Sequence, residues 1–211
     1  MEWHISTVQS LAIIDQEIAE TRFAPAEYEI LRRVIYETAD FEYESLLYFS
    51  DRALPSGAAA LAARSTLVVD VPMVQVGIAP NLQKTFANPV YCGTETITRP
   101  QKGRTQAEWG MQTLARRYPE AIFVVGQSST ALTGLVELIE EGEIKPALVI
   151  GTPSGFVGAD IAKERLRDSQ VPLIGIEGRK GSAIVAVAIV NGLVDLAWQA
   201  YGQVSNIVVV R

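Results

Sequence analysis

The segment Gly178-Arg179-Lys180-Gly181-Ser182 joins an apolar run to a long apolar helical pattern. A strand-to-helix segment of this composition can bind an anion, because backbone N–H groups and the positive end of the helix dipole face the ligand. The two glycines also let the backbone approach a ligand closely. The spacing lacks the three glycines of the dinucleotide fingerprint and does not match a Walker A loop. A solvated turn with two surface cations is the alternative interpretation.

Residues 126–130, which read Gly-Gln-Ser-Ser-Thr, form a second strand-to-helix segment. Ser128 resembles the serine of a nucleophile elbow, but that pattern needs glycine where Thr130 stands. A hydrolase triad of this kind also needs a histidine after the nucleophile, and the one histidine of the chain is His4. We therefore exclude a hydrolase triad, and we expect the hydroxyl groups to cap a helix or to bind a ligand.

Two further groups of residues are candidates for binding. Residues 152–158 form a third glycine-bearing segment, in which Phe156 offers an aromatic surface or a core side chain. Arg32, Arg33 and Tyr36 lie on one helical pattern that begins at Pro25, and their spacing allows them to face one pocket. A solvated basic stripe is the alternative for the two arginines.

The elements that must position these residues alternate along the chain. Apolar runs predict strands over 66–69, 90–92, 122–125, 147–150 and 173–176, and 3.6-residue periodicity predicts helices over 8–20, 57–64, 103–117, 130–141, 159–168 and 182–198. Because the strand runs are solidly apolar, we expect a mainly parallel sheet with helices on both faces, an α/β fold. Ligands bind such sheets at the carboxyl ends of the strands. Three glycines follow those ends, namely Gly126, Gly151 and Gly178.

Length and composition limit the protein class. The 211 residues, 48% of them hydrophobic and 20% charged, predict a single domain: a helical N-terminal part over 1–50, an α/β core over 56–203 and a tail over 204–211. A net charge of −6 argues against a nucleic-acid partner. The single cysteine, Cys92, and the single histidine exclude Cys-based and His-rich metal sites. The most apolar stretch, 182–194, is too short to span a membrane, and no signal peptide is visible, so we expect a cytoplasmic protein.

Four segments in this order resemble the precorrin-8X methylmutase family (precorrin isomerase, cobalt-precorrin-8 methylmutase) of the vitamin B12 pathway. They are SLAIID over 10–15, RVIYETADFE over 33–42, PALVIG over 146–151 with GFV over 155–157, and GRKG over 178–181. The resemblance extends over about residues 5–202. It implies an α/β enzyme that works as a homodimer and moves a methyl group from carbon 11 to carbon 12 of a corrinoid macrocycle. It implies no redox or nucleotide cofactor and no metal ligand set in the protein.

The resemblance also implies roles for individual residues. Ser10 and Arg104 stand where the family has substrate-binding residues, and Tyr36 stands where the family has a catalytic histidine. Other departures are Gly-Gln-Ser-Ser at 126–129, where the family prefers Gly-Asn-Ala-Pro, and Ser154, where the family usually has valine. Tyrosine is a weaker acid than histidine, with a reference pKa of about 10 against about 6.5, but it still donates a hydrogen bond.

A polycarboxylate ring needs a wide concave site with local cations and apolar walls, and arginine suits it because its guanidinium binds carboxylates bidentately. The predicted site has Tyr36 as its catalytic group. The predicted substrate-binding residues are Ser10, Arg32, Arg33, Thr38, Asp40, Arg104, Gly126, Gln127, Ser128, Gly155, Phe156, Arg179, Lys180 and Gly181.

Two alternatives to a methylmutase remain open at this point. A tyrosine at position 36 is compatible with a slow enzyme or with a non-catalytic homologue that binds a tetrapyrrole. A nucleotide-binding enzyme of the Rossmann type is the other alternative, and the missing dinucleotide fingerprint weakens it. The sequence leaves open whether the substrate carries cobalt and what the tail over 204–211 does.

Overall fold

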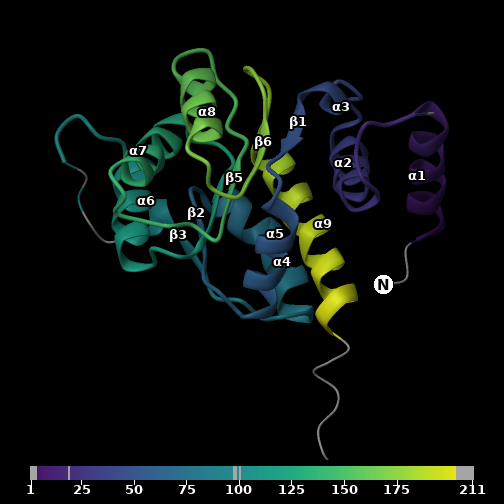
Figure 1. The fold of residues 1–211 in the computed structure, drawn as a ribbon, viewed down its shortest axis with the longest axis horizontal. Coiled ribbons are helices and arrows are strands. Elements are labelled where there is room, and N and C mark those ends of the chain that lie inside the picture. The colour runs from purple at the N-terminus through teal and green to yellow at the C-terminus, as the bar shows by residue number, and fades with distance from the viewer. Residues whose placement is uncertain (1–3, 19, 97–98, 100, 203–211) are drawn as a thin grey trace, which may run out of the picture.

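A sheet with the strand order β1-β6-β5-β4-β2-β3 runs through the molecule (Figure 1). The computed structural model describes residues 4–18, 20–96, 99 and 101–202. Strands β2 to β6 are parallel to one another, and β1 pairs with β6 in the antiparallel sense. The strands are β1 Leu47–Phe49, β2 Leu67–Val69, β3 Val90–Cys92, β4 Ile122–Val125, β5 Leu148–Gly151 and β6 Leu173–Ile176. The expected α/β architecture with a mainly parallel sheet is confirmed.

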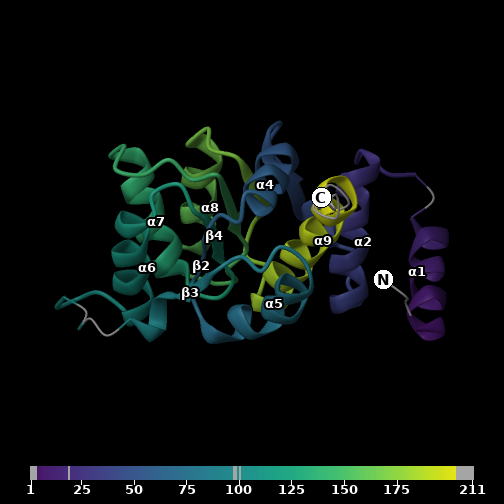
Figure 2. The same ribbon diagram turned by 90° about the horizontal axis from the view of Figure 1, so that it is seen from below.

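Helices cover both faces of the sheet (Figure 2). The layer on one face comprises α4 Ala53–Ala62, α5 Pro72–Lys84 and α9 Ala183–Tyr201, and that on the other comprises α6 Gln106–Arg117, α7 Ser129–Glu140 and α8 Ala159–Asp168. Each layer encloses its own cluster of buried side chains. Strands β4, β5 and β6 are buried along their whole length. This explains why their sequences are continuous apolar runs rather than alternating ones.

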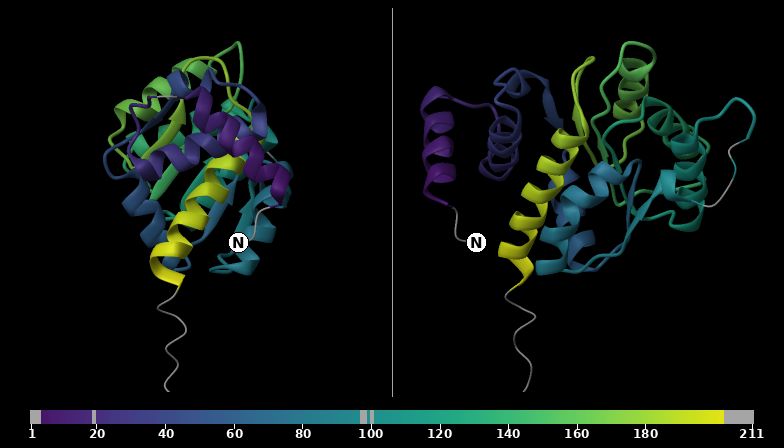
Figure 3. Two further views of the ribbon diagram at one scale, coloured as in Figure 1. Left: turned by 90° about the vertical axis from the view of Figure 1, so that its right-hand side faces the viewer. Right: turned by 180° about the vertical axis from the view of Figure 1, so that it is seen from behind.

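The N-terminal helices extend the first layer outward. Helix α2 (Pro25–Thr38) packs on α9, and α1 (Ile5–Glu17) lies outermost, against α2 (Figure 3). The short helix α3 (Tyr43–Leu46) then leads into β1, and a 3-10 turn, η1 (Gly93–Glu95), follows β3. Since β1 joins the edge of the sheet beside β6, it brings the end of α2 close to the carboxyl end of β6.

Hydroxyl side chains start three of the helices. Thr105 accepts a hydrogen bond from the N–H of Glu108, Ser128 from that of Ala131, and Ser182 from that of Val185. These bonds satisfy N–H groups that have no partner inside the helix. Ser128 is therefore a helix cap, as one of its two interpretations held.

Some elements differ from the expectations. The N-terminal part over 1–50 contains strand β1 besides its helices, and this strand of three residues is too short to show a periodic pattern. Helix α5 was not predicted, because Gly77 and Pro80 interrupt its sequence. The helix predicted over 57–64 begins earlier, at Ala53, and the one predicted from 103 begins at Gln106. The tail over 204–211 lies outside the described residues.

Helix α9 is longer than its apolar stretch suggested. Its 19 residues make it long and apolar enough to cross a membrane, judged by length and composition alone. However, 56% of its most apolar 18-residue stretch is buried inside the protein. It packs against α2, α4 and α5. Helix α9 is therefore the central core helix of its layer.

A close approach between α6 and η1 gives a test of this fold. A Cβ at Gly110 would lie 1.8 Å from the carbonyl oxygen of Gly93, so backbone would have to move. We expect Gly110→Ala to cost about 1–3 kcal/mol and to lower the Tm by about 2–10 °C. Thr113→Ala on the same helix, at a half-buried position, serves as the control and should change the Tm little. Equal Tm values for the two variants in thermal unfolding would contradict this packing.

Candidate functional site

A buried carboxylate fixes the loop between β4 and α7. Asp70 follows β2 and is fully buried. Its Oδ1 accepts the N–H of Gly126 at 3.0 Å, and its Oδ2 accepts the N–H groups of Gln127 and Ser128 at 2.8 and 2.7 Å. Three backbone donors on one carboxylate hold the loop in one conformation, because an ionised carboxylate accepts strong hydrogen bonds. The residues predicted at 126–128 are therefore held rigidly at the edge of the sheet.

Asp70 was missed from the sequence as a site residue. The available signal was its position, since it is the first residue after a buried strand whose carboxyl end lies at the ligand-binding edge of a parallel sheet. Gly126 is required at this edge as well. A Cβ there would lie 2.7 Å from a methyl group of Val74 and 2.9 Å from the Cα of Ala183.

The loops after β5 and β6 lie side by side. Gly181 has a φ of +136°, and a Cβ at this position would lie 2.1 Å from the carbonyl oxygen of Thr152. The hydroxyl of Thr152 donates to the carbonyl of Ser182 at 3.2 Å, and the N–H of Gly155 donates to the carbonyl of Arg179 at 3.2 Å. The two glycine-bearing segments predicted from the sequence therefore form one surface at the carboxyl ends of β5 and β6. We call this surface, residues 152–158 and 178–182, the rim.

The rim carries an exposed cation beside an exposed aromatic ring. Phe156 is 85% exposed, which excludes the alternative that it is a core residue. The guanidinium of Arg179 lies 5.9 Å from the centroid of this ring. Within the described part of the chain Arg179 forms no ion pair. Its charge is therefore available to an anionic ligand.

Lys180 is instead committed to the end of α2. Its ammonium donates to the carboxylates of Asp40 and Glu42, at 2.6 Å each. These hydrogen bonds raise the pKa of Lys180, and the bond from Lys180 lowers the pKa of Asp40. The ion pair between Lys180 and Asp40 joins the segment after α2 to the rim. The two residues, which were predicted separately as substrate-binding groups, therefore bind each other.

Tyr36 is half-buried between α1 and α2. Its hydroxyl oxygen lies 3.2 Å from the Oγ1 of Thr7 on α1. A small cavity of about 30 Å³ lies beside the ring; it is lined by Leu11, Glu29, Arg32, Arg33, Tyr36 and Glu37. Thr38, one half-turn further along α2, donates its hydroxyl to the carbonyl of Val34. Tyr36 is thus neither on the outer surface nor sealed in the core.

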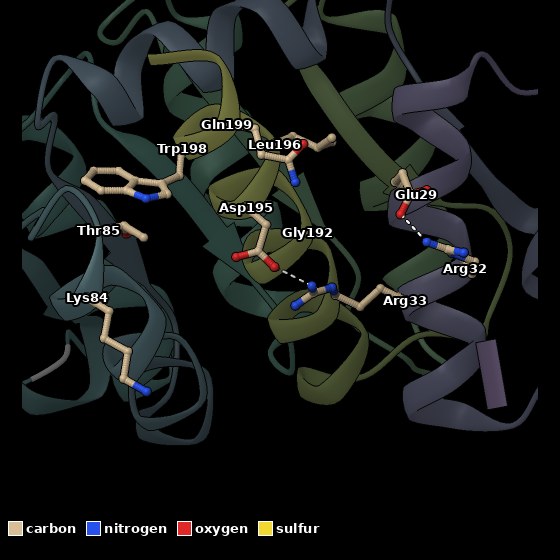
Figure 4. Close-up of a pocket in the computed structure, with 10 residues that line it drawn as sticks. All are labelled: Glu29, Arg32, Arg33, Lys84, Thr85, Gly192, Asp195, Leu196, Trp198 and Gln199. Carbon is tan, nitrogen blue, oxygen red and sulfur yellow. Dashed lines mark hydrogen bonds and ion pairs between the residues drawn. The ribbon is translucent and has the colours of Figure 1, made fainter. Parts of the chain in front are cut away.

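The arginines of α2 are paired with carboxylates. Arg32 forms ion pairs with Asp15 and Glu29, and Arg33 forms one with Asp195. Both arginines line a larger pocket of about 540 Å³ between α2, the end of α5 and α9, shown in Figure 4. That pocket is lined by Glu29, Arg32, Arg33, Lys84, Thr85, Gly192, Asp195, Leu196, Trp198 and Gln199. Since α9 starts at the rim and its later turns line this pocket, the pocket lies at the far end of the helix.

Among the described residues, no hydrogen bond or ion pair joins Arg104 or Ser10 to the rim. Arg104 donates to Glu108 at 2.7 Å and to Gln112 at 2.9 Å, so its guanidinium lies along α6. Ser10 donates its hydroxyl to the carbonyl of Ser6 within α1. His4 is exposed and caps the start of α1. No group of three or more potential metal-ligating side chains occurs among the described residues.

Comparisons with known proteins agree with one another. The family model described as precorrin-8X methylmutase matches residues 6–196. A cobalt-precorrin-8 methylmutase of Synechocystis sp. is 40% identical over 93% of this chain and 97% of its own, and a precorrin-8X methylmutase of Pseudomonas aeruginosa is 35% identical over 88% and 91%. The crystal structure of a precorrin-8X methylmutase from Thermus thermophilus superposes with a TM-score of 0.84 at 37% identity, covering 93% of this chain and 99% of that one.

The carboxylate of Asp70 gives a direct test of how the edge of the sheet is built. Asp70→Asn keeps the shape of the side chain but replaces one acceptor oxygen by an NH₂ group that faces backbone donors. We expect a loss of about 1.5–3 kcal/mol, typical of hydrogen bonds to a charged group, and a Tm lower by about 3–10 °C. The control is Asp51→Asn at an exposed turn position. If Asp70→Asn unfolds at the temperature of this control, the three N–H bonds do not stabilise the loop.

Proposed function

This chain belongs to the precorrin-8X methylmutase family, and we propose that it converts precorrin-8X, or cobalt-precorrin-8, to hydrogenobyrinic acid or cobyrinic acid in cobalamin biosynthesis. It is an isomerase, and the reaction moves one methyl group within the macrocycle. The observation that carries this proposal is the match over residues 6–196 together with the relatives of both printed names. No observation favours a non-catalytic binding protein or a nucleotide-binding enzyme.

The chemistry requires little beyond positioning and one donor. Substrate and product are isomers: the bond from the methyl group to carbon 11 breaks, the bond to carbon 12 forms, and no net electrons are gained or lost. A protein accelerates such a shift by holding the ring and by protonating, or donating a hydrogen bond to, the conjugated system as the methyl group moves.

Arg179 and Phe156 support a binding role for the rim. An unpaired guanidinium can bind a propionate or acetate carboxylate bidentately, and an exposed aromatic ring beside it offers an apolar surface to the macrocycle. The start of α9 adds the positive end of a helix dipole. Arg32, Arg33, Arg104 and Lys180 already neutralise carboxylates of the protein, so binding through them requires those ion pairs to open.

Tyr36 supplies the donor in this proposal. Among the residues that the structure describes, the hydrogen-bond neighbour of its hydroxyl group is Thr7. If Tyr36 accepts a bond from Thr7, its own proton is free to point at the substrate. The neighbouring Arg32 and Arg33 are paired with carboxylates of the protein, and the hydroxyl of Tyr36 is the group that donates a hydrogen bond to the substrate.

The test is single-turnover conversion of precorrin-8X, followed by the visible spectrum. We expect the purified wild-type chain to form hydrogenobyrinic acid. Tyr36→Phe should lower the rate at least about 10-fold, because a positioned acid or donor contributes about 10²- to 10⁴-fold. Tyr36→His should equal or exceed the wild-type rate, because histidine titrates near neutral pH.

Tyr28→Phe is the matched control for these variants. Tyr28 lies on the same helix and also bonds a residue of α1, Asp15, at 2.8 Å. It should convert substrate at the wild-type rate. An unchanged rate for Tyr36→Phe would remove the role of the phenol, and tight product binding by a wild-type chain that gives no conversion would contradict the proposed reaction.

We also infer that the protein forms a homodimer in the cytoplasm. Met73 (65% exposed) and Val76 (70% exposed) lie three residues apart and therefore on one side of α5. Exposed apolar side chains that gather on a surface are typical of interfaces.

Light scattering tests the dimer. We expect a mass of twice the 22.9 kDa of one chain, stable on dilution through the micromolar range. A mass of one chain throughout that range would overturn the inference.

A further inference from the structure

A lysine of α8 binds the loop between β6 and α9, and it has no part in the reaction proposed above. Lys163 lies on α8 and is 4% exposed. Its ammonium donates to the carbonyl oxygen of Gly178 at 2.9 Å and to that of Lys180 at 2.7 Å. Between them, the carbonyl of Arg179 accepts the N–H of Gly155. Three consecutive carbonyl groups of this loop therefore have defined partners.

We propose that Lys163 is a positioning residue for the substrate: by binding the carbonyls on both sides of Arg179, it fixes the loop that presents Arg179 to a substrate carboxylate. This inference rests on the proposed function. Lys163 does not touch the substrate in this account, because its ammonium is buried beneath the loop.

The geometry of the peptide group gives the anchoring its effect. In a trans peptide the C=O and the following N–H point in opposite directions. With the carbonyls of Gly178 and Lys180 directed at Lys163, the N–H groups of Arg179 and Gly181 are directed to the other side of the loop. Lys163 thus holds the two peptide groups on either side of Arg179 in one orientation, which fixes where the Arg179 side chain starts.

The environment of Lys163 makes its charge costly. Burial lowers the pKa of Lys163 to about 8, and the nearby carboxylate of Asp160 opposes this shift. An apolar side chain of similar length would avoid the cost of burying a charge. The hydrogen bonds to the two carbonyl groups offset that cost. They hold the loop that carries Arg179, the cation of the rim.

The other charged and titratable groups around Lys163 are carboxylates, a guanidinium group and a phenol. A cavity of about 140 Å³ lies beside it, and the groups that line this cavity with Lys163 are Tyr48 of β1, Asp160, Glu164 and Arg167 of α8, and Glu177 and Gly178 after β6. Arg167 and Glu177 form an ion pair, and burial raises the pKa of Tyr48. Carboxylates and guanidinium groups keep their charge between pH 7 and pH 9. Deprotonation of Lys163 is therefore the event expected in this cluster as the pH rises through about 8.

Visible titration with hydrogenobyrinic acid tests the proposal, because it measures binding whether or not the protein turns over. We expect Lys163→Met to weaken binding about 10- to 100-fold, the range for losing a charged hydrogen bond. Lys163→Arg, which keeps the charge and the donors, should bind within a few-fold of the wild type. Lys145→Met, at an exposed position, is the matched control and should bind like the wild type.

A double-mutant cycle separates positioning from general stability. If Lys163 acts through Arg179, then Arg179→Ala weakens binding, and adding Lys163→Met to it causes little further loss. Additive losses would show that Lys163 does not act through Arg179 and would overturn the proposal.

The pH dependence gives a second readout, which needs no folded Lys163→Met. Wild-type affinity should fall as the pH rises through about 8, because the neutral amine loses its charge-assisted bonds, whereas the affinity of Lys163→Arg should stay constant there. Parallel pH profiles, or unchanged binding by Lys163→Met, would overturn the proposal. A wild-type chain that binds the product but does not convert precorrin-8X would overturn the proposed reaction and leave this inference standing.

Discussion

The carboxyl ends of parallel strands meet at one edge of the sheet, and the backbone at that edge must be held by groups from inside the protein. Asp70 holds the backbone at the ends of β2 and β4 by accepting hydrogen bonds from three N–H groups. Gly181 does so at β5 and β6, where its missing Cβ lets the loop lie against the carbonyl of Thr152. Because both constraints hold the backbone itself, the exposed side chains of the rim start from a fixed backbone.

The antiparallel strand β1 connects this edge to the N-terminal helices. Its pairing with β6 places the segment after α2 beside the rim, where Asp40 meets Lys180. Tyr36 lies in the last turn of α2, four residues before Asp40. The position of the proposed donor relative to Arg179 therefore depends on a three-residue strand and on the two ion pairs of Lys180, rather than on the helices alone.

Much of this arrangement follows from local sequence. Solid apolar runs and intervening amphipathic helices predict the parallel sheet, and the glycine-bearing segments mark its ligand-binding edge. Local sequence does not show which carboxylate each cationic side chain pairs with. Arg33 and Lys180 read as free cations, but the fold brings Asp195 and Asp40 to them from distant segments. Nothing in the local sequence marks Lys163, because only the path of the β6–α9 loop over α8 makes it a buried anchor.

The most direct test of the central claim is a crystal structure of the protein with hydrogenobyrinic acid bound. The account predicts that the macrocycle lies across the rim, with an apolar surface against Phe156, a carboxylate on the guanidinium of Arg179 and the hydroxyl of Tyr36 directed at the ring. A macrocycle bound away from both Arg179 and Tyr36, for example in the pocket between α2, α5 and α9, would contradict it.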